Sequence, residues 1–261
     1  MGERVRSEID ARGVARLTLD RADKHNAFDD VVIRELTAEL TRLDGDAGTR
    51  LVILTGAGRS FSAGADIGWM RRMAGYGERE NRADALGLAA LMQALDGLGK
   101  PTIARVNGPA YGGGVGLIAC CDIAIAASDA RFAFTEVRLG LAPAVIAPFV
   151  IAAIGARQAR RLFATGETFD AARAQAIGLV HAVVDPAALD TAVDAVAAEL
   201  LQGGPSAQRE IKQLVAMVAR GDAGADLHAR TAELIARLRA SPEGQEGLNA
   251  FLDKRAPGWR R

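Results

Sequence analysis

The sequence predicts an α/β fold in which buried strands alternate with helices, and three observations support this. Short apolar runs rich in β-branched residues recur at 51–55, 102–106 and 122–126, as in strands that are buried on both faces. Between such runs lie longer segments with apolar residues every three or four positions, the spacing of amphipathic helices. Glycine-rich turns follow two of the strands, at 56–58 and 112–114. Strands that alternate with helices predict crossover units.

Composition excludes several classes of function. The chain has 261 residues, 49% of them hydrophobic and 25% charged, and its formal net charge is zero. No overall field therefore recruits nucleic acid or a membrane surface, and neither is expected as a partner. No apolar run reaches the roughly 20 residues of a membrane-spanning helix. The polar segment 1–10 does not resemble a secretory signal, so a cytoplasmic protein is expected.

The pattern of apolar and polar residues in the first third of the chain predicts a hairpin, a loop and a helix. Residues 5–9 and 14–19 are strand candidates around the turn 10–13,. A polar loop follows at 20–28. Asp29 or Asp30 can then cap a helix whose apolar stripe is Val32, Leu36, Leu40 and Leu43,.

The rest of the chain continues the alternation until residue 203. Helices are expected over 76–98, 115–121, 148–154, 156–164, 170–176 and 186–201, with a small strand at 180–184,. After Gly203-Gly204-Pro205 only helical patterns remain. We therefore expect a core over residues 1–203 and a C-terminal helical region over 204–261. The short C-terminal helices cannot bury both faces on themselves, which favours packing on neighbouring subunits.

Cysteine and histidine usage argues against a disulfide or a metal centre. Cys120 and Cys121 are the only cysteines and are adjacent on a predicted helix, where neighbouring side chains diverge. We interpret them as small buried apolar residues. His25, His181 and His228 have no cysteine or acidic partner at a metal-ligand spacing, so no metal site is expected.

The stretch 106–122 carries the strongest functional signal. A strand ends before Asn107, and Gly112, Gly113 and Gly114 precede an apolar helix. Unpaired N–H groups at the positive end of that helix, uncrowded by side chains, indicate a site for negative charge. Neither the dinucleotide fingerprint nor the phosphate loop with its Gly-Lys-Ser/Thr ending is present,.

Two further motifs accompany this stretch, at 59–67 and 132–143, and both combine small residues with few charges. Together the three motifs resemble the crotonase (enoyl-CoA hydratase/isomerase) superfamily, and the likeness extends from residues 20–28 to residues 251–255. The resemblance implies a spiral of β-β-α turns with C-terminal helices that form a homotrimer or a dimer of trimers. It also implies an acyl-CoA thioester as substrate and no separate cofactor, because coenzyme A is part of the substrate.

The resemblance assigns roles to three catalytic positions. The N–H groups of Ala65 and Gly113 correspond to the oxyanion hole for a thioester enolate. Relatives that hydrate with two glutamates carry one carboxylate three residues after the oxyanion glycine, where this chain has Gly116. The second carboxylate position is occupied by Glu136. One acid–base residue is therefore expected in place of two.

The resemblance also assigns residues that contact CoA or the acyl chain. The segment after Ile67 corresponds to a mobile flap over the acyl group, where Trp69, Met70, Met73 and Tyr76 can face the substrate or simply pack. The expected contacts with substrate or CoA are Lys24, His25, Ala27, Ala63, Asp66, Ile67, Gly112, Gly116, Arg138 and Lys254.

A single glutamate is compatible with two reactions. It can activate water and return a proton, which is hydration, or it can move a proton between carbons, which is double-bond isomerisation. The motifs at 112–122 and 136–141 resemble those of bacterial hydratases of 3-methylglutaconyl-CoA and isohexenylglutaconyl-CoA, from leucine and acyclic-terpene breakdown. This resemblance favours hydration of a branched, carboxylated enoyl-CoA with Arg138 as a candidate anchor. The alternatives are an isomerase or a non-catalytic CoA-binding protein.

Overall fold

The computed structural model describes residues 4–219 and 226–260, and its first elements form the predicted hairpin. Strands β1 (Val5–Ile9) and β2 (Val14–Leu19) pair antiparallel, with Val5 opposite Leu19. The Asp10 carboxylate accepts hydrogen bonds from the N–H groups of Arg12 and Val14. A side chain that bonds to the backbone two residues ahead is a common way to close a turn.

The main sheet has the strand order β1-β2-β3-β4-β6-β9. Beyond the hairpin, neighbouring strands are parallel. The four further strands are β3 (Leu51–Gly56), β4 (Thr102–Val106), β6 (Ile123–Ala127) and β9 (Ala182–Val184). All four were predicted, with ends that differ by one or two residues. The expected mixed α/β architecture is confirmed.

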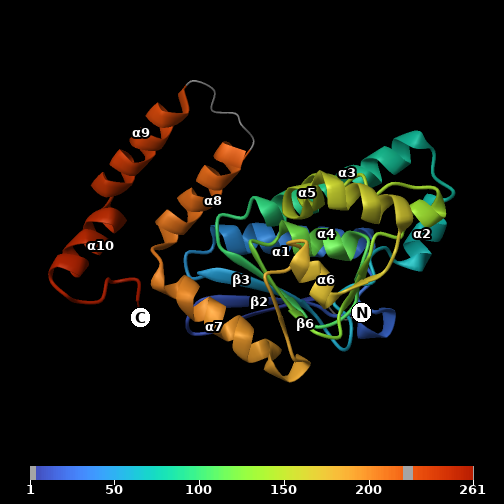
Figure 1. Ribbon diagram of the computed structural model, residues 1–261, viewed down its shortest axis with the longest axis horizontal. Coiled ribbons are helices and arrows are strands. Elements are labelled where there is room, and N and C mark those ends of the chain that lie inside the picture. Colours follow the sequence, from blue (N-terminus) through green and yellow to red (C-terminus); the bar gives the residue numbers. More distant parts are fainter. Residues whose placement is uncertain (1–3, 220–225, 261) are drawn as a thin grey trace.

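Helices cover both faces of this sheet (Figure 1). On one face lie α1 (Asp30–Gly45), α3 (Glu78–Asp96) and α4 (Gly113–Cys120) over the larger core. On the other face, α7 (Leu189–Gln202) covers a smaller core. Asp29 caps α1 by accepting from the N–H groups of Val31 and Val32, which stabilises a helix start by about 1 kcal/mol.

Three more helices complete the core, and one of them contains a break. They are α2 (Ile67–Met73), α5 (Ala147–Thr165) and α6 (Ala171–Ala176). Two successive helices were predicted where α5 lies, and the division is real, because Gly155 has φ 75° and ψ 154° inside α5. Short 3-10 turns occur at Ala22–Lys24, Glu136–Leu139 and Pro186–Ala188.

A second, small sheet was not predicted. It has the order β5-β7-β8 and is formed by β5 (Ala110–Tyr111), β7 (Arg131–Ala133) and β8 (Phe169–Asp170). Strands of two or three residues are too short to show an alternating pattern. The rings of Phe132 and Phe169 stack with their centroids 5.6 Å apart, so side-chain packing adds to the few backbone hydrogen bonds of this sheet.

The C-terminal helices are α8 (Pro205–Ala219), α9 (Leu227–Ala240) and α10 (Pro242–Leu252). They lie to one side of the sheet, with α9 and α10 furthest from it in Figure 1. Lys212 of α8 joins the core through a 2.8 Å ion pair with Asp122. Phe251 is 81% exposed and Leu252 73% exposed. Large apolar residues exposed together are typical of a contact surface.

None of the helices in residues 4–219 and 226–260 is both long and apolar enough to span a lipid bilayer.

We expect the full chain to assemble through these C-terminal helices. Light scattering should give a mass three or six times the 27.3 kDa of one chain. Phe251→Glu places a charge where an apolar ring would be buried between subunits, so it should shift the mass toward that of the monomer. A chain that ends at residue 203 should not assemble at all.

The matched control is Asn249→Glu, because Asn249 is an exposed polar residue on the same helix. It adds the same charge and should leave the mass unchanged. A monomeric wild-type chain would contradict the expectation.

Candidate active site

Backbone pairing on both sides of β5 aligns three chain segments, one through the small sheet and one through an isolated bridge at Ser62. The Tyr111 N–H donates to the carbonyl of Ser62 at 2.9 Å, and the Gly112 N–H donates to the carbonyl of Ala133 at 2.9 Å. These bonds tie the segment after Ser62, the segment after β5 and the segment after β7 to one another. The two predicted N–H donors and the predicted carboxylate follow on these three segments.

The N–H groups of Ala65 and Gly113 have no acceptor within the described residues. The Phe28 backbone forms hydrogen bonds with both neighbours of Ala65: its N–H donates to the Gly64 carbonyl, and its carbonyl accepts from the Asp66 N–H. The N–H of Ala65 itself is left unused. Gly113 begins α4, where N–H groups carry the partial positive charge of the helix dipole. Two unused donors are what an oxyanion hole requires.

Glycine at position 64 lets the two donor loops approach each other. Its φ is +80°, and a Cβ there would lie 2.7 Å from the carbonyl oxygen of Tyr111 and 3.6 Å from the Gly113 nitrogen. Any larger residue would be strained in this backbone conformation and would push the loops apart.

Glu136 reaches the same place from the start of the 3-10 turn after β7. Its Oε2 is buried and has no hydrogen-bond partner. A Cβ at Gly112 would lie only 2.8 Å from Oε1, so the absence of a side chain at Gly112 makes room for the carboxylate. Burial raises the pKa of Glu136, although a hydrogen bond from its own backbone N–H opposes the shift,. An unpartnered carboxylate with a raised pKa is suited to proton transfer.

These groups line one cavity of about 400 Å³. Five of the predicted site residues face it, namely Ala63, Ala65, Gly112, Gly113 and Glu136. Of the predicted flap residues, Trp69, Met70 and Met73 also line it, whereas Tyr76 does not. The remaining walls are mostly apolar and come from Phe28, Gly64, Ala85, Leu88, Thr135, Leu139 and residues 142–146.

Several predicted CoA contacts lie beside the cavity and not in its wall. The Lys24 Nζ is 3.2 Å from the Asp66 carboxylate, which also caps α2. Burial would raise the pKa of Asp66, but the Lys24 and Trp69 hydrogen bonds and the nearby Arg21 charge hold it below its usual value. The His25 Nδ1 is 2.9 Å from the Ser60 hydroxyl oxygen.

Backbone contacts complete this edge of the site. The His25 carbonyl accepts from the Ala63 N–H, and the Ala27 carbonyl accepts from Arg21. Loop 20–28 and loop 57–66 are therefore one connected unit next to the donors. Ile67 is 69% exposed at the start of α2. A role of these residues in CoA binding stays a prediction.

Gly116, Arg138 and Lys254 are not in the cavity wall. Gly116 is buried, and a Cβ there would overlap Ile146 and lie 3.3 Å from the Met92 Cε. The space that a second carboxylate would need is therefore filled by apolar side chains. Arg138 is exposed on the 3-10 turn. Lys254 follows α10, and α10 and α2 lie at opposite ends of the molecule in Figure 1.

Two polar residues of the cavity were missed by the sequence analysis. Asn81 and Asp84 lie on α3 and line the cavity together with Ala85 and Leu88. Their spacing of three and four residues places all four on one face of the helix. This spacing was visible in the sequence, but the charges at the start of this segment, such as Glu78, Arg79 and Arg82, are more typical of a helix face in contact with solvent,. Burial raises the pKa of Asp84, while the hydrogen bond from Trp69 opposes the shift.

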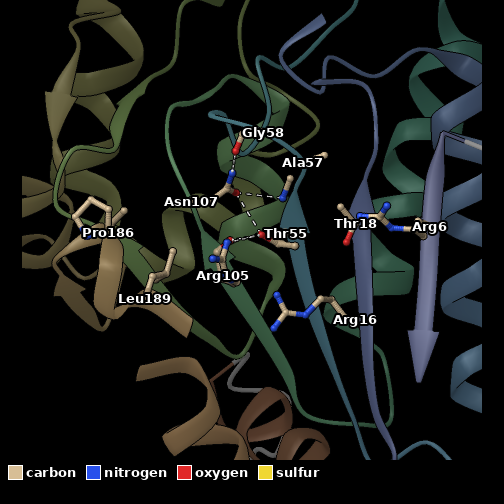
Figure 2. Close-up of a pocket in the computed structure, with 12 residues that line it drawn as sticks. Arg6, Arg16, Thr18, Thr55, Ala57, Gly58, Arg105, Asn107, Pro186 and Leu189 are labelled. Atoms are coloured by element: carbon tan, nitrogen blue, oxygen red, sulfur yellow. Dashed lines mark hydrogen bonds between the residues drawn. The ribbon is translucent and has the colours of Figure 1, made fainter. Parts of the chain in front are cut away.

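A second cavity of about 400 Å³ differs in chemistry (Figure 2). The side chains of Arg6, Arg16 and Arg105 line this cavity. The Asn107 side chain forms hydrogen bonds with the Thr55 hydroxyl and the Gly58 carbonyl. Arg105 gives two 2.8 Å hydrogen bonds to Asp190. Among the residues that the structure describes, none in this wall has a carboxylate, imidazole or thiol. It therefore offers no group that exchanges a proton near neutral pH.

The cysteines have the buried environment that was predicted. Cys120 and Cys121 are both free and buried, and burial raises the pKa of both thiols. Such thiols are unreactive as nucleophiles. Within residues 4–219 and 226–260, no three or more His, Cys, Asp and Glu side chains are grouped so that they could hold a metal ion.

Comparison with known proteins identifies the family of the chain. The sequence pattern of the family Enoyl-CoA hydratase/isomerase matches residues 10–261. A putative enoyl-CoA hydratase of Thermus thermophilus is 34% identical over 96% of this chain and 98% of its own length. A crotonyl-CoA hydratase of Syntrophomonas wolfei is 34% identical over 93% of this chain and 92% of its own.

A solved structure gives the same result for the fold. The crystal structure of an enoyl-CoA hydratase from Shewanella pealeana superposes with a TM-score of 0.95 and 44% identity, over 98% of this chain and 96% of that one. The chain is therefore an enzyme that belongs to the enoyl-CoA hydratase/isomerase family of the crotonase superfamily.

Proposed function

We propose that this chain hydrates the α,β double bond of an enoyl-CoA thioester, with Glu136 as its only acid–base residue. One observation carries the proposal: the buried Oε2 of Glu136 has no partner and lies in the cavity that holds the Ala65 and Gly113 donors. A buried carboxylate without a partner is costly. It is therefore expected where a ligand or water completes its hydrogen bonding.

The reaction follows from these positions. The thioester oxygen lies between the two N–H groups, which stabilise the negative charge that develops on it. Glu136 takes a proton from water as the water oxygen bonds to the β-carbon. The same carboxyl group then gives its proton to the α-carbon, and the enolate returns to a thioester. Each oxyanion donor contributes about 2.7–4 kcal/mol of transition-state stabilisation.

Loop 20–28 supplies the proposed contacts for the CoA portion, with Lys24 and His25 beside the donor loop.

Glu136→Gln tests the acid–base assignment. The amide keeps the size of the side chain but cannot accept a proton, so kcat should fall by about 10²–10⁴-fold or more. Binding of the thioester should change little, because both N–H donors remain. The measurement is the loss of enoyl-thioester absorbance with crotonyl-CoA. Glu167→Gln, on the surface and paired with Arg161, is the control and should be fully active.

Isomerisation is the second candidate, because one carboxylate is sufficient to move a proton between two carbons. Incubation in oxygen-labelled water distinguishes the two reactions. Hydration places the label on the β-carbon of the product, whereas isomerisation of a β,γ-enoyl thioester incorporates none. If the product is a conjugated enoyl thioester without label, the hydratase proposal is wrong. If no reaction occurs at all, a non-catalytic CoA-binding protein is favoured.

Ala65→Pro tests the oxyanion hole. Proline removes the N–H that would bond to the enolate oxygen, so kcat should fall by about 10²–10³-fold. Ala65→Ser keeps the N–H and should retain most of the activity. Position 113 is less suited to this test, because a Cβ there would overlap the Phe28 ring. Unchanged turnover in a folded Ala65→Pro variant would show that this N–H is not used.

In a pH profile of kcat/KM, the decrease on the acidic side should report the pKa of Glu136. Burial raises that pKa above its ordinary value of 4.5, and the base must be ionised to take the water proton. kcat/KM should therefore be full above the raised pKa and fall tenfold per pH unit below it. A pH profile with crotonyl-CoA locates the midpoint. A midpoint at or below 4.5 would argue against a buried base.

The acyl group remains a separate question. The sequence analysis favours a branched, carboxylated chain such as 3-methylglutaconyl-CoA with Arg138 as its anchor, and this stays a prediction that turnover of CoA thioesters with different acyl groups would test. Its support is the likeness of the motifs. The cavity walls support a neutral chain instead, since they are largely apolar and Arg138 is not among them. A crotonyl-CoA hydratase and a short-chain-enoyl-CoA hydratase are among the relatives.

A further inference from the structure

Asp84 places a second carboxylate in the acyl cavity, apart from the acid–base residue. It lies on α3 and lines the cavity. The buried Trp69 ring donates from Nε1 to the Asp84 Oδ1 at 3.1 Å. This bond holds the carboxyl group in place between α2 and α3. Within residues 4–219 and 226–260 the other Asp84 oxygen accepts no hydrogen bond, and the catalytic steps do not use the residue.

The charged side chains in the cavity wall are both negative. Asp84 and Glu136 are its carboxylates, and none of the described residues in its wall is Lys, Arg or His. Outside the wall, the charges of Asp30 and Arg72 both act on Asp84, with opposite effects on its pKa. These two side chains form a 2.6 Å ion pair with each other, so the Arg72 guanidinium is already engaged. A carboxylate on a substrate would therefore meet like charge without a compensating cation in the cavity wall.

We propose that Asp84 is a specificity residue that excludes acyl chains with a free carboxylate, so that the acyl group of the substrate is neutral. The inference rests on the proposed function, because it concerns the acyl chain of that thioester. Selection by an unfavourable contact is as effective as selection by an attractive one. Like charges in a partly desolvated cavity repel strongly, or force one group to take up a proton before binding.

The apolar walls alone disfavour a charged chain, so wild-type preference does not isolate Asp84. The informative quantity is the change in preference when only its charge is removed. Asp84→Asn keeps an oxygen that can accept from Trp69, and Asp84→Ala removes both the charge and the acceptor. A charge effect appears in both variants, whereas a purely structural role of the Trp69 bond would separate them.

The experiment measures binding of two saturated thioesters, pentanoyl-CoA and glutaryl-CoA, by titration calorimetry. They have the same number of carbons and differ in a terminal methyl or carboxylate. Wild type should bind pentanoyl-CoA more tightly. Asp84→Asn and Asp84→Ala should each reduce the ratio of the two dissociation constants by about tenfold or more, through tighter binding of glutaryl-CoA. Glu80→Gln removes a charge from the exposed side of α3 and should leave the ratio as in wild type.

An unchanged ratio in both Asp84 variants overturns the proposal, and so does equal binding of the two thioesters by wild type. Hydration of crotonyl-CoA is measured on the same preparations. A chain that binds both thioesters without hydrating crotonyl-CoA refutes the proposed reaction, while the ratio still decides the role of Asp84. A chain that binds neither thioester refutes both.

Discussion

Two backbone hydrogen bonds at the end of β5 are the constraint on which the site depends. Through them the Ser62 carbonyl accepts from Tyr111 and the Ala133 carbonyl accepts from Gly112. Three segments that are far apart in the sequence are thereby placed next to one another, and the two N–H donors and Glu136 follow from that alignment. The main sheet and its helices supply the large buried core, and the small sheet sets the geometry of the chemistry.

Next to the small sheet, polar groups without hydrogen-bond partners lower the stability of the fold but are available to react with a substrate. Two N–H groups and one carboxylate oxygen remain without partners within the described residues, and each such buried group destabilises a fold by about 1–3 kcal/mol. Neighbouring polar residues are fully engaged by contrast. Asn26 bonds to the carbonyls of Ala57 and Ser60, so the loops that carry the donors are held rigidly. The Glu136 Oε2 is, among the buried side-chain atoms without a partner in the described residues, the one that lies in the cavity with the two N–H donors, where a substrate or water would complete its hydrogen bonding.

Sequence patterns predicted the parts whose signal is periodic or long. The main-sheet strands, α1 with its Asp29 cap and the divided α5 all follow from spacing and capping chemistry. The small sheet could not be predicted, because its two- and three-residue strands depend on tertiary pairing. For the site, motif likeness found the donors and Glu136. Asp84 was missed because a charge on a helix has the same local pattern whether it faces water or a cavity.

Gly116 has a consequence for how such a site can change over time. A side chain there would overlap Ile146 and crowd Met92, so the volume that a two-glutamate site gives to its second acid is already occupied by core packing. A glutamate introduced alone would bury a charge in a filled space, and trimming Ile146 alone would leave a void. Each change made alone is therefore expected to destabilise the fold, and the two made together should do so less. The effect of a substitution at Gly116 thus depends on which side chains stand at Ile146 and Met92, and this epistasis opposes the gain of a second carboxylate.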